Sequence, residues 1–433
     1  KGNGSVPDDH TGFSGINVIE GELLLKGTAA RAEDTVFDVL NCDWRIGQNT
    51  AVSADPVFTL DHATLDARGT HCALGYGTYV TTGTKSATLN LRNGAWFHGN
   101  SLFCGSCASG FSGNPEDNVY TRIHASGGST LETDYNLNLC YHHKGWGEHL
   151  FEGGSAVLAK LGVGVEVRYP IRAVWDSGSV LAATRTDGVC TPTKLATYNG
   201  ATGQMTFRNG STFYVNSFKH DNNGDFKLSF DGGTWDACGD MDFVFRYADK
   251  LTIEATGAGL TLPPAAGQTY RMASKISGTG GLVKTGAGTL AFVPRERLDA
   301  KTGTTPEAMD DPVTWGFDGT LEVREGTVTV ANGCTREGAL PVKVSSDAEL
   351  RLASASDVTL LIDLGYSEES PMPESLLGKP IRLPIAYDGV LPVNFAKWRV
   401  GPTGVPRAKA RLTAEDGAVF VTVDIRGMSI IIR

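Results

Sequence analysis

Short apolar positions separated by glycine are the dominant pattern of this chain, and the pattern is clearest between Lys275 and Phe292. Apolar residues occur there only in small groups, such as Leu282-Val283 and Leu290-Ala291-Phe292. Strands of a few residues that each end in a turn fit this pattern, whereas helical spacing does not. The motif that we follow below comprises Gly278, Gly280, Gly281, Leu282, Lys284, Gly286, Gly288 and Leu290.

Related units precede and follow this motif. Residues 315–332 again alternate apolar and polar positions around Gly-Thr pairs. The intervals from Gly210 to Gly233 and from Gly233 to Gly257 are nearly equal, and each is close to the length of one turn of a solenoid. The same sequence of alternating strand, turn and second strand occurs at 89–97, 205–213 and 228–235. Tandem units predict an all-β parallel solenoid, and longer intervals such as Gly94 to Gly128 predict inserted loops.

The run Gly-Thr-Gly-Gly-Leu-Val-Lys-Thr-Gly-Ala-Gly-Thr-Leu-Ala-Phe at 278–292, with the Gly-Thr-Leu and Gly-Thr-Val strands after it, resembles a known repeat. It is similar to the passenger-associated strand repeat of bacterial autotransporter-type surface proteins. The close match covers about 275–332. Members of that family form right-handed parallel β-helices outside the cell, so the resemblance implies that fold and an extracellular or cell-surface location here.

The sequence is also compatible with a second fold, an antiparallel sandwich. Asn93-Gly94 and Asn209-Gly210 are the strongest short signals for a β-hairpin, so the same strands could form an antiparallel sandwich. We prefer the solenoid, chiefly because of the repeat resemblance.

Three parts are expected along the chain. Residues 1–14 are polar and glycine-rich and predict an N-terminal arm, and 15–355 predict the β-helix with inserted loops. Seven prolines between 356 and 408 replace the glycine pattern, which predicts a β-rich cap module at 356–433. The end of a solenoid exposes unpaired backbone groups, so a cap is expected at one end and end-to-end self-association through the arm at the other.

Charge and composition exclude some classes of binding partner. The net charge of −10 leaves no basic patch for a phosphate backbone, so nucleic acid is not an expected partner. No run of eighteen apolar residues exists, so no membrane-spanning helix is expected. No basic and apolar leader stands at Lys1, so we expect the mature form of an exported protein.

The cysteines fit an extracellular protein. Seven of the eight lie before residue 240 and are predicted to form disulfides, although eight cysteines allow 105 connectivities. The spacing of Cys104 and Cys107 also occurs in redox pairs, but no helix pattern follows it, so a structural disulfide is preferred. The predicted disulfide cysteines are Cys42, Cys72, Cys104, Cys107, Cys140, Cys190 and Cys238.

Few segments of the sequence suggest a metal-binding or catalytic site. The acidic segment 231–242 could hold calcium and the histidine-rich segment 142–149 could hold zinc, but a solvated loop is the preferred interpretation of each. Asp310-Asp311 alone matches the segments shared by pectin hydrolases of the β-helix fold. Trp96 and Trp235 are predicted to hold equivalent core positions, whereas Trp146 is expected to be exposed, where it could stack on a sugar ring. We assign no catalytic residue, metal or cofactor from the sequence.

The sequence therefore predicts a non-enzymatic, secreted bacterial surface or adhesin-like protein that associates with itself or with a surface glycan or protein. The alternative is a β-helical polysaccharide lyase, glycoside hydrolase or glycan-binding protein. An enzyme of this fold should carry a cleft with convergent carboxylates on one sheet face, and the structural hypothesis predicts none.

Overall fold

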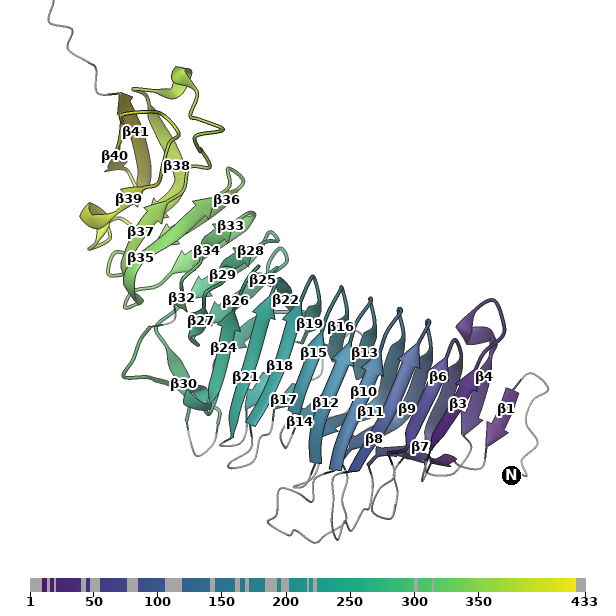
Figure 1. Cartoon of the computed structure of the whole chain (residues 1–433). Coiled ribbons are helices and arrows are strands. Elements are labelled where there is room, and N and C mark those ends of the chain that lie inside the picture. Colours follow the sequence, from purple (N-terminus) through teal and green to yellow (C-terminus); the bar gives the residue numbers. More distant parts are fainter. Residues whose placement is uncertain are drawn as a thin grey trace, which may run out of the picture. The chain divides into compact units, whose positions relative to one another are not determined.

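The structure is a computed structural model (Figure 1). It describes residues 10–13, 16–18, 21–39, 44–46, 55–75, 85–105, 119–140, 145–159, 164–167, 171–183, 193–195, 202–215, 218–220, 224–299, 303–313 and 315–425. Regular structure in these ranges is almost entirely β, and the helices η1 (Ala32–Asp34), η3 (Ala248–Lys250), η4 (Glu374–Leu376) and η5 (Phe395–Lys397) are single 3₁₀ turns. None of the described helices is long and apolar enough to cross a membrane.

The chain forms two compact units. The first comprises Lys1–Cys238, Phe245–Glu254 and Leu298–Thr304, and the second comprises Gly239–Val244, Ala255–Arg297 and Thr305–Arg433. This division differs from the boundary at 355/356 that the change of composition suggested. Residues 10–13 of the expected N-terminal arm form a strand that pairs in parallel with Val36–Val39.

One parallel sheet of the first unit follows the chain in order, and Figure 1 shows its strands side by side. Its members are β3 (Glu22–Lys26), β6 (Val57–Asp61), β8 (Lys85–Arg92), β10 (Val119–Ala125), β12 (Gly145–Phe151), β15 (Ile171–Trp175), β18 (Thr202–Arg208), β21 (Asp225–Asp231) and β24 (Leu251–Ala255). We call this the polar-row sheet, because Arg172, Gln204 and Lys227 form a row across three of its strands.

A second parallel sheet of this unit has two arms. The first arm holds β1 (His10–Phe13), β4 (Val36–Val39), β7 (Thr64–Leu74), β9 (Trp96–Cys104), β11 (Thr130–Cys140), β13 (Ala156–Ala159), β16 (Val180–Ala183), β19 (Thr212–Tyr214) and β22 (Gly233–Asp236). The second arm holds β2 (Ile16–Val18), β5 (Trp44–Ile46), β14 (Gly164–Val167), β17 (Thr193–Leu195) and β20 (Phe218–His220). The long strands β7, β9 and β11 belong to both arms, and register shifts mark the corner between the arms.

Each Asn-Gly turn connects strands of two different sheets rather than the two paired strands of a hairpin. Asn93 and Gly94 have φ angles of 59° and 75°, as a hairpin turn requires. However, β8 before the turn pairs in parallel with β6 and β10, and β9 after it pairs in parallel with β7 and β11. The Gly94 amide donates to the carbonyl of Gly127 at the next turn, so the turns themselves stack. The antiparallel alternative is therefore wrong for this part of the chain.

Aromatic side chains fill the inward side of the first unit. Phe151, Trp175, Phe207 and Phe230 are paired in register on consecutive strands, and each is fully buried. Their ring centroids are 4.9, 4.9 and 5.4 Å apart with nearly parallel planes, so the rings form a continuous stack. The interval from Phe207 to Phe230 equals that from Gly210 to Gly233, which agrees with the predicted repeat length.

The predicted equivalence of Trp96 and Trp235 is wrong by one residue. Trp235 is fully buried and pairs with Phe213, and the same column of register pairs leads back to Phe97. Side chains alternate between the faces of a strand, so Trp96 lies on the opposite face from Phe97 and is only half-buried. The predicted core position therefore belongs to Phe97.

The disulfide prediction is wrong for Cys72, Cys104 and Cys140. Each carries a buried thiol on the inward side of the second sheet, where cysteine packs as a small apolar side chain. Burial raises the pKa of Cys104 well above its ordinary value, with a smaller contribution from neighbouring Cys140, which is the reverse of a reactive redox thiol. Cys334 is likewise a buried thiol, while Cys238 is disulfide-bonded. Cys42, Cys107 and Cys190 lie outside the described residues.

The second unit also consists mainly of parallel pairs. One sheet holds β23 (Met241–Phe243), β26 (Thr269–Met272), β29 (Thr289–Phe292), β34 (Gly326–Val330), β36 (Ala348–Leu352) and β38 (Pro380–Tyr387). Beside them run β25 (Leu260–Leu262), β28 (Leu282–Lys284), β33 (Leu321–Val323), β35 (Thr335–Val344), β37 (Asp357–Ile362) and β39 (Arg399–Val400). Shorter pairs are β27 (Ile276–Gly278) with β32 (Trp315–Phe317), and β30 (Glu296–Leu298) with β31 (Pro306–Ala308).

Antiparallel strand pairing appears at the end of the second unit. Strand β41 (Ala418–Ile425) pairs antiparallel with β38 and with β40 (Ala408–Glu415). These strands belong to the segment 356–433 that was expected to be β-rich, and the residues after Ile425 lie outside the described part of the chain. Exposed Lys409, Arg411 and Glu415 alternate along β40, and charged side chains of this kind discourage edge pairing with another sheet.

Glycines of the motif are required by backbone packing. Gly286 has a φ of 73°, and a Cβ there would lie 2.5 Å from the carbonyl oxygen of Pro264. A Cβ on Gly288 would lie 2.2 Å from the carbonyl oxygen of Ala265. The motif glycines therefore permit a left-handed turn at Gly286 and a close approach of neighbouring backbone at Gly288.

Lys284 of the same motif points inward. It lies in register between Leu262 and Val323 and is fully buried. Its ammonium donates to the carbonyl oxygens of Thr285, Gly286 and Glu325 at 3.0, 2.6 and 2.8 Å, which satisfies all three N–H groups. The lysine therefore ties the turn after β28 to the turn after β33.

Candidate functional site

A cluster of polar side chains lies on the outer face of the second sheet, at the corner between its arms. Glu132 and Asp134 are next-but-one neighbours on β11 and so leave the strand on the same side. His98 on β9 is the register partner of Glu132. The β9–β11 register shifts between Thr133 and Asn136, and irregularities of this kind redirect side chains near functional sites.

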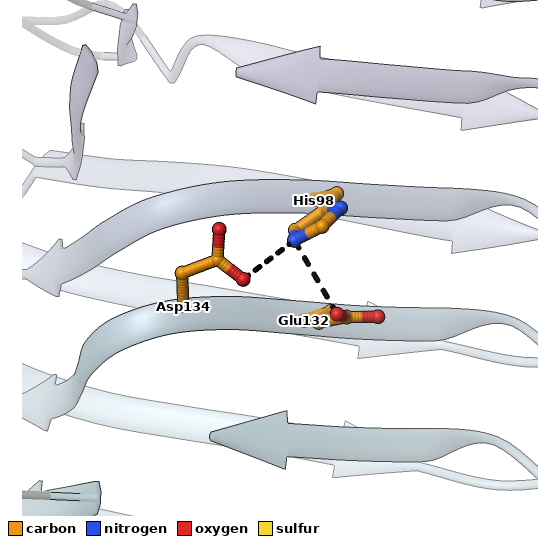
Figure 2. Close-up of side chains that lie close together, drawn as sticks. All are labelled: His98, Glu132 and Asp134. Atoms are coloured by element: carbon orange, nitrogen blue, oxygen red, sulfur yellow. Dashed lines mark hydrogen bonds and ion pairs between the residues drawn. The ribbon is translucent and has the colours of Figure 1, made fainter. Parts of the chain in front are cut away.

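The three side chains converge on one point (Figure 2). His98 Nε2 lies 2.9 Å from Asp134 Oδ1 and 3.3 Å from Glu132 Oε1. His98 is 8% exposed and Glu132 is 2% exposed, whereas Asp134 is half-buried. Ionisable side chains with so little exposure are uncommon on the outer face of a sheet and need compensating partners.

Trp96 fixes the orientation of two members of this cluster. Its ring stacks on the imidazole of His98 with a centroid distance of 5.5 Å and an interplanar angle of 9°. Its indole Nε1 donates a hydrogen bond of 3.1 Å to Glu132 Oε2. Since Oε2 is held by the indole, Oε1 is the oxygen that faces His98.

Asp66 and Arg68 on β7 form the neighbouring ion pair. Asp66 is the register partner of His98, and Arg68 Nε lies 3.0 and 3.1 Å from its two carboxylate oxygens. Burial alone would raise the pKa of Asp66, but hydrogen bonds and charge from Arg68 outweigh this effect and lower the pKa. Asp66 is therefore ionised and is held by its own basic partner.

This arrangement can do two kinds of chemistry. An imidazole and two carboxylates that share one centre are a ligand set for a divalent metal, and they are also groups that can accept and donate protons. Within the ranges that the structure describes, His98, Glu132 and Asp134 are the one group of three or more such side chains with metal-like spacing. We call these three residues the His98 cluster.

Of the possible metal ligands in the histidine-rich segment, the structure describes Glu148 and His149, and these two side chains do not share a metal site. Glu148 faces outward, with its carboxylate 3.3 Å from Arg122 Nε, while the adjacent His149 faces inward and is 3% exposed. His149 Nε2 lies 2.9 Å from the Leu139 carbonyl oxygen, and Nδ1 accepts the Ile123 amide at 3.2 Å. Burial lowers the pKa of His149 to about 4. The segment from Gly145 is strand β12 rather than a loop, and His142 and His143 lie outside the described residues.

The acidic segment is likewise divided among separate partners. Asp240 accepts the Thr269 amide at 2.7 Å, and Asp242 forms an ion pair of 3.0 Å with Arg271. Asp231 and Asp236 lie in strands β21 and β22. Asp311, from the pair matched to pectin hydrolases, lies 3.5 Å from Arg295. The preferred interpretation of a solvated loop between strands therefore describes 231–242 only in part, because strands occupy both of its ends.

A groove lies on the outer face of the polar-row sheet. It has a volume of about 420 Å³ and lies entirely within the first unit. Its walls include half-buried Trp146, exposed Arg172 and half-buried Gln204 and Lys227. Trp146 lies with its ring 6.4 Å from that of Tyr120 on the neighbouring strand. Trp146 was expected to be exposed; it is half-buried and lines the groove, whereas Trp175 and Trp235 lie fully buried in the core.

Sequence inspection missed the His98 cluster although its spacing was visible. The interval from Gly94 to Gly128 equals that from His98 to Glu132, so the histidine and the glutamate occupy the same place after their turn glycines. Aligning the two turns would have placed the histidine beside the glutamate. The shift of register that positions Asp134 has no equivalent signal in the sequence.

No known protein family, curated protein or solved structure matches this chain.

Proposed function

We propose that this chain is a secreted bacterial surface protein of the adhesin type, in which a right-handed parallel β-helix presents a carbohydrate-binding groove. The observation that carries the proposal is the groove beside Trp146 on a sheet of regularly stacked parallel strands. A stack of this kind is a rigid support, and binding residues on regular strands are held more precisely than residues on loops.

The β-helix is favoured by the order of the strands. Each strand of the polar-row sheet pairs in parallel with the next strand of that sheet along the chain, and strands of the second sheet lie between them in sequence. The chain therefore leaves the polar-row sheet, passes through the second sheet and returns to pair with its previous strand, as a chain that winds in one direction does. Parallel crossovers are right-handed in nearly all proteins, which supports the right-handed form.

Carbohydrate is favoured by the side chains of the groove. Arg172, Gln204 and Lys227 are consecutive register partners, so they form a row of polar groups that crosses the strands at intervals of about 4.8 Å. Trp146 adds an aromatic face at one end. Sugar rings present C–H groups to aromatic faces and hydroxyls to amides and charged groups, and a row across strands suits an extended chain of sugars.

Location and assembly remain parts of the same proposal. The resemblance of the 278–292 motif to autotransporter passenger repeats supports an extracellular or cell-surface location. Self-association through the ends of the stack is a prediction that light scattering on the purified chain tests directly, since a strictly monomeric protein at high concentration excludes it.

The binding test uses immobilised neutral and acidic polysaccharides. We expect the chain to be retained on at least one of them, and Trp146→Ala and Arg172→Ala to reduce retention by at least tenfold. Tyr135→Ala is the matched control, because it removes an aromatic residue that is 53% exposed and lies outside the groove. Equal retention of the parent chain and both groove variants would remove the groove from the proposal.

The convergent carboxylates of the His98 cluster are the observation that favours the second candidate, a β-helical carbohydrate-active enzyme. Glu132 and Asp134 lie within reach of one histidine on one sheet face, and such convergence is expected by the enzyme hypothesis and not by the structural one. The groove at Trp146 belongs to the other sheet of the unit. Measuring the products released from a retained polysaccharide distinguishes the two candidates.

A further inference from the structure

We propose that His98 Nε2, Glu132 Oε1 and Asp134 Oδ1 form a binding site for a divalent transition metal, with zinc as the best match. This inference does not depend on carbohydrate binding, because the His98 cluster and the Trp146 groove lie on different sheets.

The positions of the donor atoms are the first argument. All three lie within 4.8 Å of one another, and Nε2 is 2.9 and 3.3 Å from the two carboxylate oxygens. Zinc binds nitrogen and oxygen at about 2.0–2.2 Å, so two of its ligands are separated by roughly 3 Å or slightly more. Two of the three donor separations are therefore close to those of a zinc site, and the third is within 4.8 Å.

The charges at this corner are the second argument. Asp66, Glu132 and Asp134 bring three carboxylates together, while Arg68 donates its hydrogen bonds to Asp66 and its single charge is shared with Asp134 and Glu132. Glu132 is only 2% exposed, and a carboxylate with so little access to water is stabilised by a nearby positive charge. A divalent cation bound by a neutral imidazole and the carboxylates of Glu132 and Asp134 makes an electrically neutral group.

The surroundings of the ligands are the third argument. Metal-binding carboxylates are usually oriented by a hydrogen bond to their second oxygen, and Trp96 Nε1 supplies that bond to Glu132 Oε2. The indole also stacks on His98 and fixes its plane. Trp96 is thus a positioning residue that contacts both buried ligands without binding the metal itself.

The kinds of donor atom limit which metals fit the site. One imidazole nitrogen with two carboxylate oxygens suits zinc, cobalt or manganese, whereas calcium requires six to eight oxygen ligands. Three protein donors also leave a coordination position for water or another small ligand, as in zinc sites that keep an open position.

The test is isothermal titration of the full chain with Zn²⁺ after treatment with a chelator. We expect one equivalent to bind, Ca²⁺ not to compete, and His98→Ala and Glu132→Gln each to weaken binding by at least 100-fold. Trp96→Phe should weaken binding by about 10- to 100-fold through loss of orientation. Substitution with Co²⁺ should give a visible d–d absorption that Glu132→Gln abolishes.

The matched control is His124→Ala. His124 lies 2.8 Å from Glu152 in an exposed histidine–carboxylate pair, so its removal should leave zinc binding unchanged. If Glu132→Gln fails to fold by circular dichroism, Asp134→Asn at the half-buried ligand replaces it. Absence of zinc binding to the parent chain, or affinity that is unchanged in His98→Ala, would overturn the proposal.

Discussion

Two buried polar side chains, those of Lys284 and His149, link neighbouring strands through hydrogen bonds to the backbone. Lys284 interrupts an inward column of apolar residues, and its ammonium is accepted by three backbone carbonyls. His149 occupies an inward position on β12 and joins a backbone amide to a backbone carbonyl. Both residues act as connectors between neighbouring strands, because a buried polar group remains tolerable only when its hydrogen bonds are made.

Replacing Lys284 by methionine should destabilise the protein at pH 7. Methionine fills similar volume but leaves buried carbonyls without the ammonium, at a cost of about 2–4 kcal/mol in the free energy of unfolding. Chemical denaturation of both proteins measures this difference. Lys343→Met, at an exposed position on β35, is the control and should change stability by less than about 0.5 kcal/mol.

The same lysine predicts a pH dependence. Burial lowers the pKa of Lys284 to about 8, partly opposed by the charge of Glu325, from its ordinary value of 10.5. Between these pH values the unfolded chain holds the proton and the folded chain has lost it, so the contribution of Lys284 to the unfolding free energy rises with pH. The stability difference between the parent and Lys284→Met should therefore widen from pH 8 to 10.5. A constant difference would contradict this assignment.

His149 predicts a loss of stability in acid. Its pKa of about 4 lies below the ordinary value of 6.5, so the unfolded chain takes up a proton first as the pH falls. The free energy of unfolding should decrease by about 3 kcal/mol through this window, on the basis of about 1.4 kcal/mol per pH unit. His149→Gln should flatten the decrease, whereas His124→Gln, which removes an exposed histidine, should retain it.

At the scale of elements, the strands and the interval between paired strands were predictable, whereas the face of each residue and the register shift at the corner were not. Alternation predicted strands at 89–97 and 205–213, and the Gly-rich motif correctly predicted turns at Gly286 and Gly288. Trp96 was placed on the wrong face because an error of one residue in alignment reverses every side chain of a strand. The His98 cluster depends on pairing between β9 and β11, which are not consecutive in the sequence, and a register shift at Asp134 completes it.

Turn geometry gives a direct test at this scale. Gly286→Val should lower the free energy of unfolding by about 1–3 kcal/mol, because the new side chain meets both an unfavourable φ and the Pro264 carbonyl oxygen. Gly239→Val is the matched control, since a Cβ there has nothing within 4 Å. Equal melting temperatures for the parent and Gly286→Val would show that the turn can relax.

At the scale of the whole molecule, stacked strands and aromatic side chains fill the described interior, and three of the cysteines expected to form cross-links pack there as thiols. The cysteine count suggested extensive disulfides, but Cys72, Cys104 and Cys140 are core residues of the second sheet. An even number of cysteines is therefore weak evidence for disulfides in a chain with a long apolar interior, because cysteine is also a common buried residue.

Thiol titration checks this correction. Denatured, unreduced protein should show at least four reactive thiols, from Cys72, Cys104, Cys140 and Cys334. Native protein should react slowly at these positions because the four thiols are buried. Two or fewer thiols in the denatured protein would restore the disulfide-rich interpretation.

Product release is the measurement that tests the central claim most directly. The chain is incubated with each polysaccharide that retains it, and new reducing ends and unsaturated products are measured, with and without Zn²⁺. The account predicts retention that depends on Trp146 and no product under either condition. Sustained release of product that is lost in Glu132→Gln would contradict the adhesin proposal and identify the His98 cluster as a catalytic centre.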